Sequence, residues 1–237
     1  MPFPRALFLV PLLLAATACP AMNGGVSLNH TRVIFAAGDK AQTVMVKNTG
    51  QQNYLIQSRM QNQPDNPVAG SFIATPPLFP LAAQSSQMLR ILKQDDTLPA
   101  DRESLSYLTV LAIPAQTEPS ADDARLSMGF QFMIKLFYRP QGLKITPEQA
   151  SCQLTFSRTA QGIRAENPTP YFLTFGSLNF GKQRVDLDNQ PSMIAPMSSA
   201  TYRVAGPVAQ VRWQTLTDVG GLSSTCLQPL LSPQETL

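Results

Sequence analysis

Hydrophobic and polar residues alternate with a period of two along most of this chain. The alternation comes in short runs that turn-forming residues separate. The first-half runs are VSLNHTRVIF (26–35), QTVMVKN (42–48), YLIQSRMQN (54–62), SFIATPPLF (71–79), SSQMLRILK (85–93), SLSYLTVLAIP (104–114) and LSMGFQFMIKLFYRP (126–140). They predict about seven strands in about 115 residues, with a break at Pro76 and Pro77, which is the pattern of an antiparallel immunoglobulin-like sandwich.

A second set of strands is predicted after Pro140. The segment QGLKITPEQA (141–150) is interpreted as a linker, and Gly, Pro, Asn and Asp clusters separate the runs that follow it. These runs are SCQLTFSRT, GIRAENP, YFLTFGSLNF, ATYRV, VAQVRWQTL and STCLQPLL. We therefore expect an all-β protein with immunoglobulin-like domains at 22–141 and 142–237, and no helix longer than one or two turns.

The N-terminal stretch MPFPRALFLVPLLLAATACPA predicts a secretory signal peptide over residues 1–21. It has one cation, Arg5, an apolar run from Ala6 to Ala16 and small residues after it, and it is too short for a mature membrane anchor. Cleavage after Ala21 is preferred, with Ala18 as the alternative. A lipoprotein role for Cys19 is disfavoured, because Ala16 stands where such signals carry a bulky aliphatic residue.

Composition and charge narrow the function classes. The 237 residues are 43% hydrophobic and 14% charged, with 21 prolines, which fits a globular, loop-rich β protein. The formal net charge is +3 without a Lys/Arg block, so nucleic acid is not an expected partner. The single histidine, His30, has no nucleophile motif or base partner, so an enzyme is disfavoured. No metal or cofactor is expected.

The exported chain would keep Cys152 and Cys226. An oxidising compartment favours a disulfide between them. Neither cysteine has His or Cys neighbours at zinc-ligand spacing, which argues against a metal site. We expect the two cysteines in the first and last strands of the second domain.

The run 126–136 has one wholly apolar face. Two interpretations stay open: the face is the core of its own domain, or part of it is a docking edge that adds a strand to another chain. The same run ends in IKLFYRP, which carries Lys135 and Arg139. Cations within a strand need negative partners, and the sequence pattern does not say what these two meet.

Six dispersed stretches carry a family resemblance. They are VSLNHTRVIF, IATPPLFPL, LPADRESLSYL, IKLFYRP, ENPTPYFLTF and DVGGL, in that order along nearly the whole mature chain. The chain resembles the PapD-like periplasmic chaperones of the chaperone–usher pilus pathway. The resemblance implies two immunoglobulin-like domains in a boomerang arrangement. It also implies a periplasmic chaperone that binds, folds and caps pilus subunits by donor-strand complementation and delivers them to an outer-membrane usher.

The resemblance also assigns roles to residues. Arg32 and Lys135 would anchor the C-terminal carboxylate of a pilus subunit by charge-assisted hydrogen bonds. The donor residues would be Leu126, Met128, Phe130 and Phe132. Lys135 has the opposite parity to them, so both roles require a bend, a bulge or the use of two strand faces.

Further implications concern Arg139 and the partners. Glu103, Arg139 and Asp218 would form an ionic network that fixes the angle between the domains. Pro80 stands where relatives often have Arg, in a region of subunit or usher contacts. The short segment 115–125 resembles the branch that serves rod-like pili. An exported adhesin or structural pilus component is the alternative, disfavoured because both strand sets are complete. A self-capped homodimer of the free protein is a further expectation.

Overall fold

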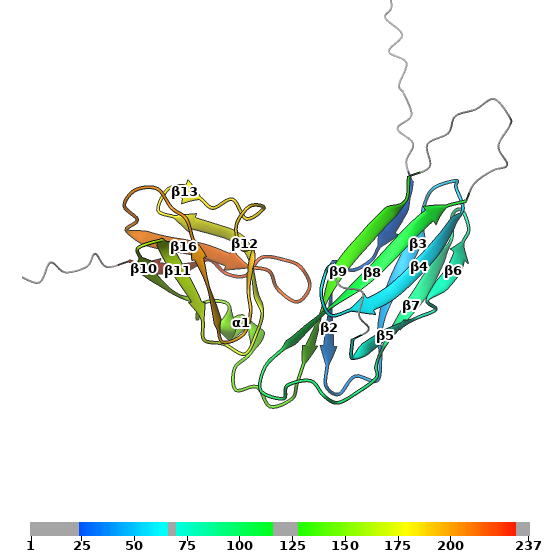
Figure 1. Cartoon of the computed structure of the whole chain (residues 1–237), viewed down its shortest axis with the longest axis horizontal. Helices are drawn as coiled ribbons and strands as arrows, with labels where there is room; N and C mark the ends of the chain where they lie inside the picture. Colours follow the sequence, from blue (N-terminus) through cyan, green and yellow to red (C-terminus); the bar gives the residue numbers. More distant parts are fainter. Residues whose placement is uncertain (1–23, 66–69, 116–127, 231–237) are drawn as a thin grey trace, which may run out of the picture.

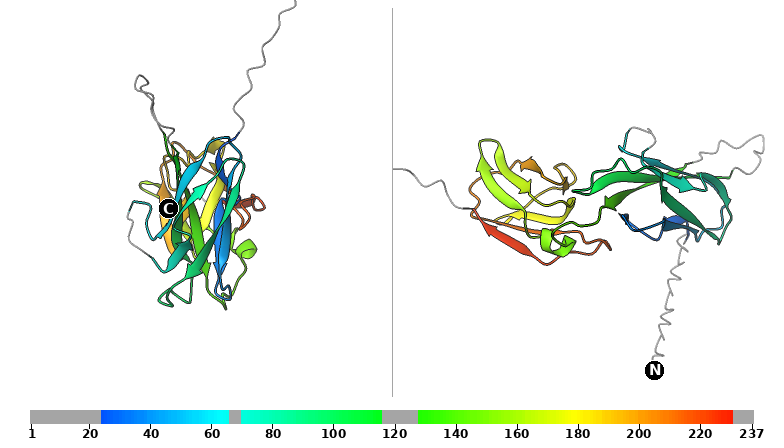
Figure 2. Two further views of the ribbon diagram at one scale, coloured as in Figure 1. Left: turned by 90° about the vertical axis from the view of Figure 1, so that its right-hand side faces the viewer. Right: turned by 90° about the horizontal axis from the view of Figure 1, so that it is seen from below.

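The computed structural model describes residues 24–65, 70–115 and 128–230. The chain forms two β-sandwiches, which meet at an angle in Figure 1 and follow one another along the long axis in Figure 2. The predicted all-β, two-sandwich fold is confirmed. The predicted signal peptide, Leu126 and the segment 116–125 lie outside the described residues. Within the described residues, no helix has the length and hydropathy needed to cross a membrane.

The first sandwich consists of a four-stranded and a five-stranded sheet. The four-stranded sheet has the order β1 (Val26–Leu28), β3 (Gln42–Asn48), β7 (Ser86–Lys93), β5 (Phe72–Thr75). The five-stranded sheet has the order β2 (Arg32–Ala36), β9 (Phe130–Arg139), β8 (Ser104–Pro114), β4 (Tyr54–Gln61), β6 (Leu78–Leu81). The core lies between them, because alternate side chains such as Val44, Ile56, Leu89 and Leu108 are fully buried.

Two predicted strands are divided between the sheets. VSLNHTRVIF was predicted as one strand, which is wrong: β1 and β2 belong to different sheets. The chain crosses between them at Asn29, whose side-chain oxygen accepts the N–H of Met45 at 2.8 Å. SFIATPPLF breaks at its two prolines as predicted, and its halves, β5 and β6, also lie in different sheets. The first domain therefore has nine described strands, β1 to β9.

The second sandwich has a three-stranded and a five-stranded sheet. The first has the order β10 (Thr155–Thr159), β11 (Gly162–Asn167), β15 (Ser198–Tyr202). The second has the order β13 (Gln183–Arg184), β12 (Leu173–Phe180), β16 (Gln210–Thr215), β17 (Cys226–Pro229), with β14 (Met193–Ile194) beside β12. The core is centred on Trp213, Phe156 and Tyr202. The two-residue strands β13 and β14 were not predicted, because they are too short to show an alternation.

The predicted linker contains one turn of helix, α1 (Pro147–Ala150). Thr146 and Gln149 form a reciprocal capping box: Thr146 Oγ1 accepts the Gln149 N–H, and Gln149 Oε1 accepts the Thr146 N–H. The helix brings Ser151 against the core, where its carbonyl accepts the indole N–H of Trp213 at 2.9 Å. The linker is therefore packed onto the second domain rather than extended.

The disulfide expected from the exported compartment is present between Cys152 and Cys226, whose Cα atoms are 5.4 Å apart. Cys226 opens β17, the last strand, as predicted. Cys152 lies in the turn after α1 and not in the first strand, because β10 begins only at Thr155. The bond thus ties the start of the second domain to its last strand.

Replacing both cysteines by serine is expected to lower the free energy of unfolding of the second domain by about 2–4 kcal/mol, because the cross-link closes a long loop in the unfolded chain. The sequence separation is 74 residues. Denaturant unfolding followed by Trp213 fluorescence measures the change, since Trp213 lies in that core. A variant whose midpoint matches that of the oxidised chain would contradict the expectation.

Candidate functional site

Arg32 and Lys135 are direct neighbours across two strands. β2 pairs with β9 in parallel, and Arg32 is the register partner of Lys135. Register partners place their side chains on the same face of the sheet. Both side chains are half-buried. Two cations are therefore held side by side at the first residue of β2.

Burial and mutual repulsion disfavour the charged forms of Arg32 and Lys135, which would favour an anion between them. Burial lowers the pKa of Arg32, and the nearby carboxylates of Asp218 and Glu103 act in the opposite direction. Burial and the charge of Arg32 lower the pKa of Lys135. Among the described residues, neither cation forms a salt bridge. An anion placed between them would offset both the desolvation and the mutual repulsion.

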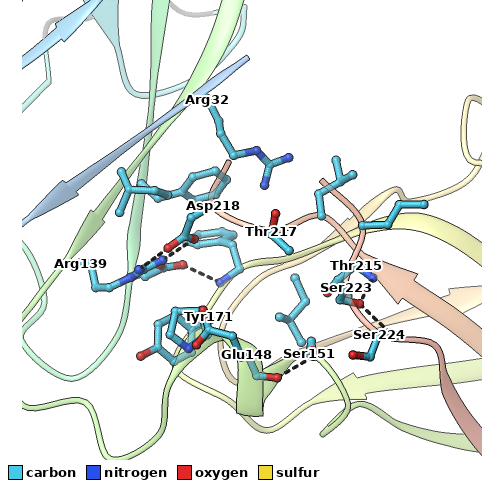
Figure 3. Close-up of a pocket in the computed structure, with 18 residues that line it drawn as sticks. Arg32, Arg139, Glu148, Ser151, Tyr171, Thr215, Thr217, Asp218, Ser223 and Ser224 are labelled. Carbon is cyan, nitrogen blue, oxygen red and sulfur yellow. Dashed lines mark hydrogen bonds and ion pairs between the residues drawn. The ribbon is translucent and has the colours of Figure 1, made fainter. Parts of the chain in front are cut away.

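Arg139 is bound by carboxylates from both domains. Its Nε donates to Glu103 Oε1 at 2.9 Å, and its two terminal nitrogens donate to the Asp218 oxygens at 2.7 and 2.9 Å (Figure 3). Glu103 belongs to the first domain, and Asp218 lies between β16 and β17 of the second. The predicted network residues are thus in contact, in the bidentate geometry that guanidinium and carboxylate groups favour.

The second domain contributes further contacts that the sequence did not predict. Glu103 Oε2 accepts the backbone N–H of Phe172 at 2.9 Å, and the Phe172 ring lies 5.6 Å from that of Phe137. The guanidinium of Arg139 lies 5.2 Å from the ring centre of Tyr171. Tyr171 and Phe172 follow the prolines of NPTPY, and only the resemblance singled this stretch out.

The two acidic partners of Arg139 differ in burial. Glu103 is almost fully buried, and that burial raises its pKa against the opposing effects of Arg139 and the Phe172 N–H. Burial lowers the pKa of Arg139, but Asp218 and Glu103 raise it by more, so the net shift is upward. Arg139 is thus secured as a cation, and Glu103 depends on it for a compensating charge.

A cleft of about 270 Å³ lies between the domains. Its first-domain wall is the outer face of β2 and β9, and its second-domain wall includes α1 and the segments 171–173, 215–218 and 222–224. Figure 3 shows the guanidinium of Arg32 directed into this cleft on the side of Thr217, away from Arg139. Lys135 does not line the cleft itself but stands beside Arg32 at its edge.

Strand β9 is covered on one edge over only part of its length. β2 pairs with Lys135–Arg139, whereas β8 pairs with Phe130–Tyr138. Within the described residues, the edge of Phe130–Ile134 that faces away from β8 has no strand partner. The first half of β9 is therefore an open edge that leads to the pair of cations.

Burial along the apolar face of β9 differs between the two ends of the strand. Leu136 is fully buried in the domain core and Phe132 packs partly against it, whereas Phe130 is 51% exposed and Met128, just before the strand, is 59% exposed. The apolar face of β9 is therefore buried in the domain core at Leu136 and exposed to solvent at Phe130. The β8–β9 register is unbroken, so Lys135 lies on the opposite face without a bulge. Phe132 is less available than Phe130, and Leu126 is outside the described residues.

Among the described residues, no group of three or more His, Cys, Asp or Glu side chains is arranged to hold a metal ion. The candidate site consists instead of an open strand edge, two adjacent cations and an interdomain cleft.

Two family models together match most of the chain. Residues 25–144 match the model described as "Pili and flagellar-assembly chaperone, PapD N-terminal domain", and residues 149–227 match "Pili assembly chaperone PapD, C-terminal domain". The fold and these matches define a two-domain pilus-assembly chaperone. The chain belongs to the PapD family.

Individual relatives agree with this assignment. The chaperone protein FimC of Escherichia coli strain K12 is 37% identical over 215 residues, covering 90% of this chain and 87% of FimC. The chaperone protein FimB/FhaD of Bordetella pertussis is 35% identical over 219 residues, covering 88% and 89%. These relatives are chaperones by name, which favours a chaperone over the adhesin alternative.

Solved structures show the same arrangement. The chain is similar to a chain of the Salmonella enterica SafA pilin–SafB chaperone complex, with a TM-score of 0.79, 30% identity and coverage of 87% of this chain and 96% of that one. It is also similar to the periplasmic chaperone SfaE, with a TM-score of 0.73, 35% identity and coverage of 88% and 100%.

Proposed function

We propose that this chain is a periplasmic chaperone that holds a pilus subunit by lending it the first half of β9 and by binding its C-terminal carboxylate with Arg32 and Lys135. One observation carries the proposal: β2 covers only Lys135–Arg139, so the open edge of Phe130–Ile134 ends at the two cations. An open apolar edge normally invites aggregation, and strand addition by a client is its productive use.

The direction of the client strand follows from this geometry. β2 runs parallel to β9, and Arg32 is its first residue. A client strand on the same edge, in line with β2, meets Arg32 with its C-terminus only if it also runs parallel to β9. The carboxylate then fixes the register, because a slip of one residue would turn every client side chain to the other face.

Two separate contributions to the binding free energy are expected along β9, one from the cations and one from the apolar side chains. Each charge-assisted hydrogen bond to the carboxylate would contribute roughly 1.5–3 kcal/mol. Burial of Met128 and Phe130 in the client would contribute about 3–6 kcal/mol before the costs of association. Neither term requires a nucleotide or a cofactor. The chaperone would thus complete an unfinished sandwich with side chains that its own core does not use.

Delivery to an outer-membrane usher is the second part of the proposal. The outer face of the five-stranded sheet carries an apolar patch, defined by Leu55, Leu78, Pro80 and Ile113, all but Pro80 among the large hydrophobic residues exposed to solvent. Leu55 is the register partner of both Pro80 and Ile113, so the patch is continuous over β6, β4 and β8. Exposed apolar patches of this kind mark protein interaction sites.

In the free protein, the open edge of β9 would instead accept a second copy and form a self-capped homodimer.

Phe130→Glu is expected to weaken subunit capture at least tenfold, because a carboxylate would have to enter the apolar groove of the client. Phe130 is half-exposed in the free chain, so the variant should stay soluble. Co-expression with pilin genes encoded beside the chaperone gene, followed by pull-down of the tagged chaperone, measures capture.

Leu227→Glu is the matched control, since Leu227 is 58% exposed but lies on β17 of the second domain. Normal capture by Phe130→Glu would rule out donation of this strand, whereas equal loss in both variants would indicate a general effect of added charge.

A further inference from the structure

The contacts proposed for the client all belong to the first domain, yet one loop of the second domain borders the same cleft, which its residues Thr217 and Asp218 line. This cleft loop, Thr217–Gly221, connects the region of β16 to that of β17. It is closed on itself: the Thr217 N–H donates to the Gly221 carbonyl at 2.8 Å, and the Gly220 N–H donates to the Thr217 carbonyl at 2.9 Å. Gly220 has a φ of 84°, a conformation that favours glycine. The loop is thus a tight, defined turn.

The cleft loop binds the first domain at Asp218 and approaches it closely at Gly220. Asp218 accepts both hydrogen bonds of its bidentate pair with Arg139. Two residues further on, a Cβ atom at Gly220 would lie 2.9 Å from Oγ1 of Thr31, the residue that precedes Arg32. These contacts place the loop beside the start of β2 in the free chain.

Between these two points, the loop presents an apolar side chain to solvent. Val219 is 91% exposed, and Leu222, just after the loop, is 56% exposed and lines the cleft. Two buried polar atoms at the same place, Nε of Arg32 and Oγ1 of Thr217, have no hydrogen-bond partner among the described residues. A valine exposed to this extent gains little from packing in the free chain, and unpartnered polar atoms of two residues that line the cleft mark an incomplete surface.

We propose that the cleft loop is a third contact for the pilus subunit, in which Val219 packs against an apolar side chain within the last residues of the client strand. This inference rests on the proposed function, because Arg32 and Lys135 bring the end of that strand to the loop. The second domain then contacts the side chains that precede the carboxylate and discriminates between them, while the first domain binds the carboxylate itself. Clients with an apolar residue at the end of the strand are favoured.

Val219→Ser tests the proposal with little risk to the fold, because the side chain is almost fully exposed. The probes are acetylated twelve-residue peptides of alternating apolar and polar residues, ending in leucine or serine with a free carboxylate. Wild-type chain should bind the leucine peptide about three- to tenfold more tightly than the serine peptide, and Val219→Ser should remove most of that preference. Leu227→Ser, which removes an exposed apolar side chain from β17, should keep it.

A second measurement locates the contact. Val219→Cys labelled with an environment-sensitive fluorophore should shift its emission to shorter wavelength when the leucine peptide binds, whereas labelled Leu227→Cys should not. An unchanged preference in Val219→Ser together with an unshifted label at position 219 would overturn the inference. Failure of the proposed function looks different: the peptides would not bind wild-type chain, or Lys135→Ala would bind them as tightly as wild type.

Discussion

Replacing Arg32 and Lys135 together by alanine is expected to abolish the accumulation of pilus subunits with this chaperone, although the chain itself still folds. The two cations are register partners at the end of the open edge of β9. Loss of two charge-assisted hydrogen bonds corresponds to roughly 10²- to 10⁴-fold weaker binding of the subunit carboxylate. The fold should tolerate the change, because removal of two adjacent, desolvated cations relieves their repulsion.

The measurement is the amount of subunit recovered with the tagged chaperone from the periplasm, supported by circular dichroism of each purified variant. Lys47→Ala and Arg90→Ala are the matched controls, since both cations are exposed on strands of the opposite sheet, β3 and β7. Unchanged subunit levels in the double variant would remove the carboxylate anchor from the proposal. A further check is a subunit peptide with a C-terminal amide, which should bind wild type and double variant alike.

The alternation of side chains predicted most strands, because it is the direct consequence of placing one face of each strand in a core. The predicted bounds of β3 and β8 are the same as the observed bounds. The alternation could not predict where the chain changes sheets. In VSLNHTRVIF, the change is accompanied by a hydrogen bond between Asn29 and Met45, which lies on another strand. Local pattern carries no information about such a partner.

The site was predictable only in part. The pattern showed that Lys135 and Arg139 need anions, but the roles of Arg32, Glu103 and Asp218 came from the resemblance. Asp218 is 79 residues from Arg139 in sequence, so no spacing rule could pair them. The open edge of β9 is a property of sheet topology, since it exists only because β2 is shorter than β9. Val219 is a single apolar residue in a glycine-rich turn, which has no distinguishing sequence signal.

The ionic network connects these separate features of the cleft. Arg139 lies on β9, the strand that carries Lys135, and binds Asp218 of the cleft loop. The guanidinium of Arg139 thus connects β9, which is proposed to bind the client strand, to the cleft loop, which is proposed to contact the terminal side chains of the client. Preorganisation of this kind lowers the entropic cost of binding, so the network would contribute to the proposed binding of the client as well as to stability.

Arg139→Ala is the variant expected to destabilise the chain most, by about 3–5 kcal/mol, because it leaves the buried carboxylate of Glu103 without a compensating charge. The side chain of Glu103 is 3% exposed, whereas that of Asp218 is 40% exposed. Asp218→Asn removes the other half of the network and should cost no more than about 1 kcal/mol, since solvent screens that pair. Urea unfolding of both variants measures the difference.

The pH dependence distinguishes this cause from simple loss of packing. Burial already raises the pKa of Glu103, and loss of Arg139 should raise it further. A carboxyl whose pKa is higher in the folded than in the unfolded state binds more protons when folded, so its contribution to stability is lost as pH rises through the folded pKa. The cost of Arg139→Ala should therefore shrink below the ordinary pKa of a glutamate, where Glu103 is protonated in both states. A cost that stays constant from pH 4 to pH 7 would mean that the lost contacts of Arg139 with Tyr171, and not the stranded charge of Glu103, account for the destabilisation.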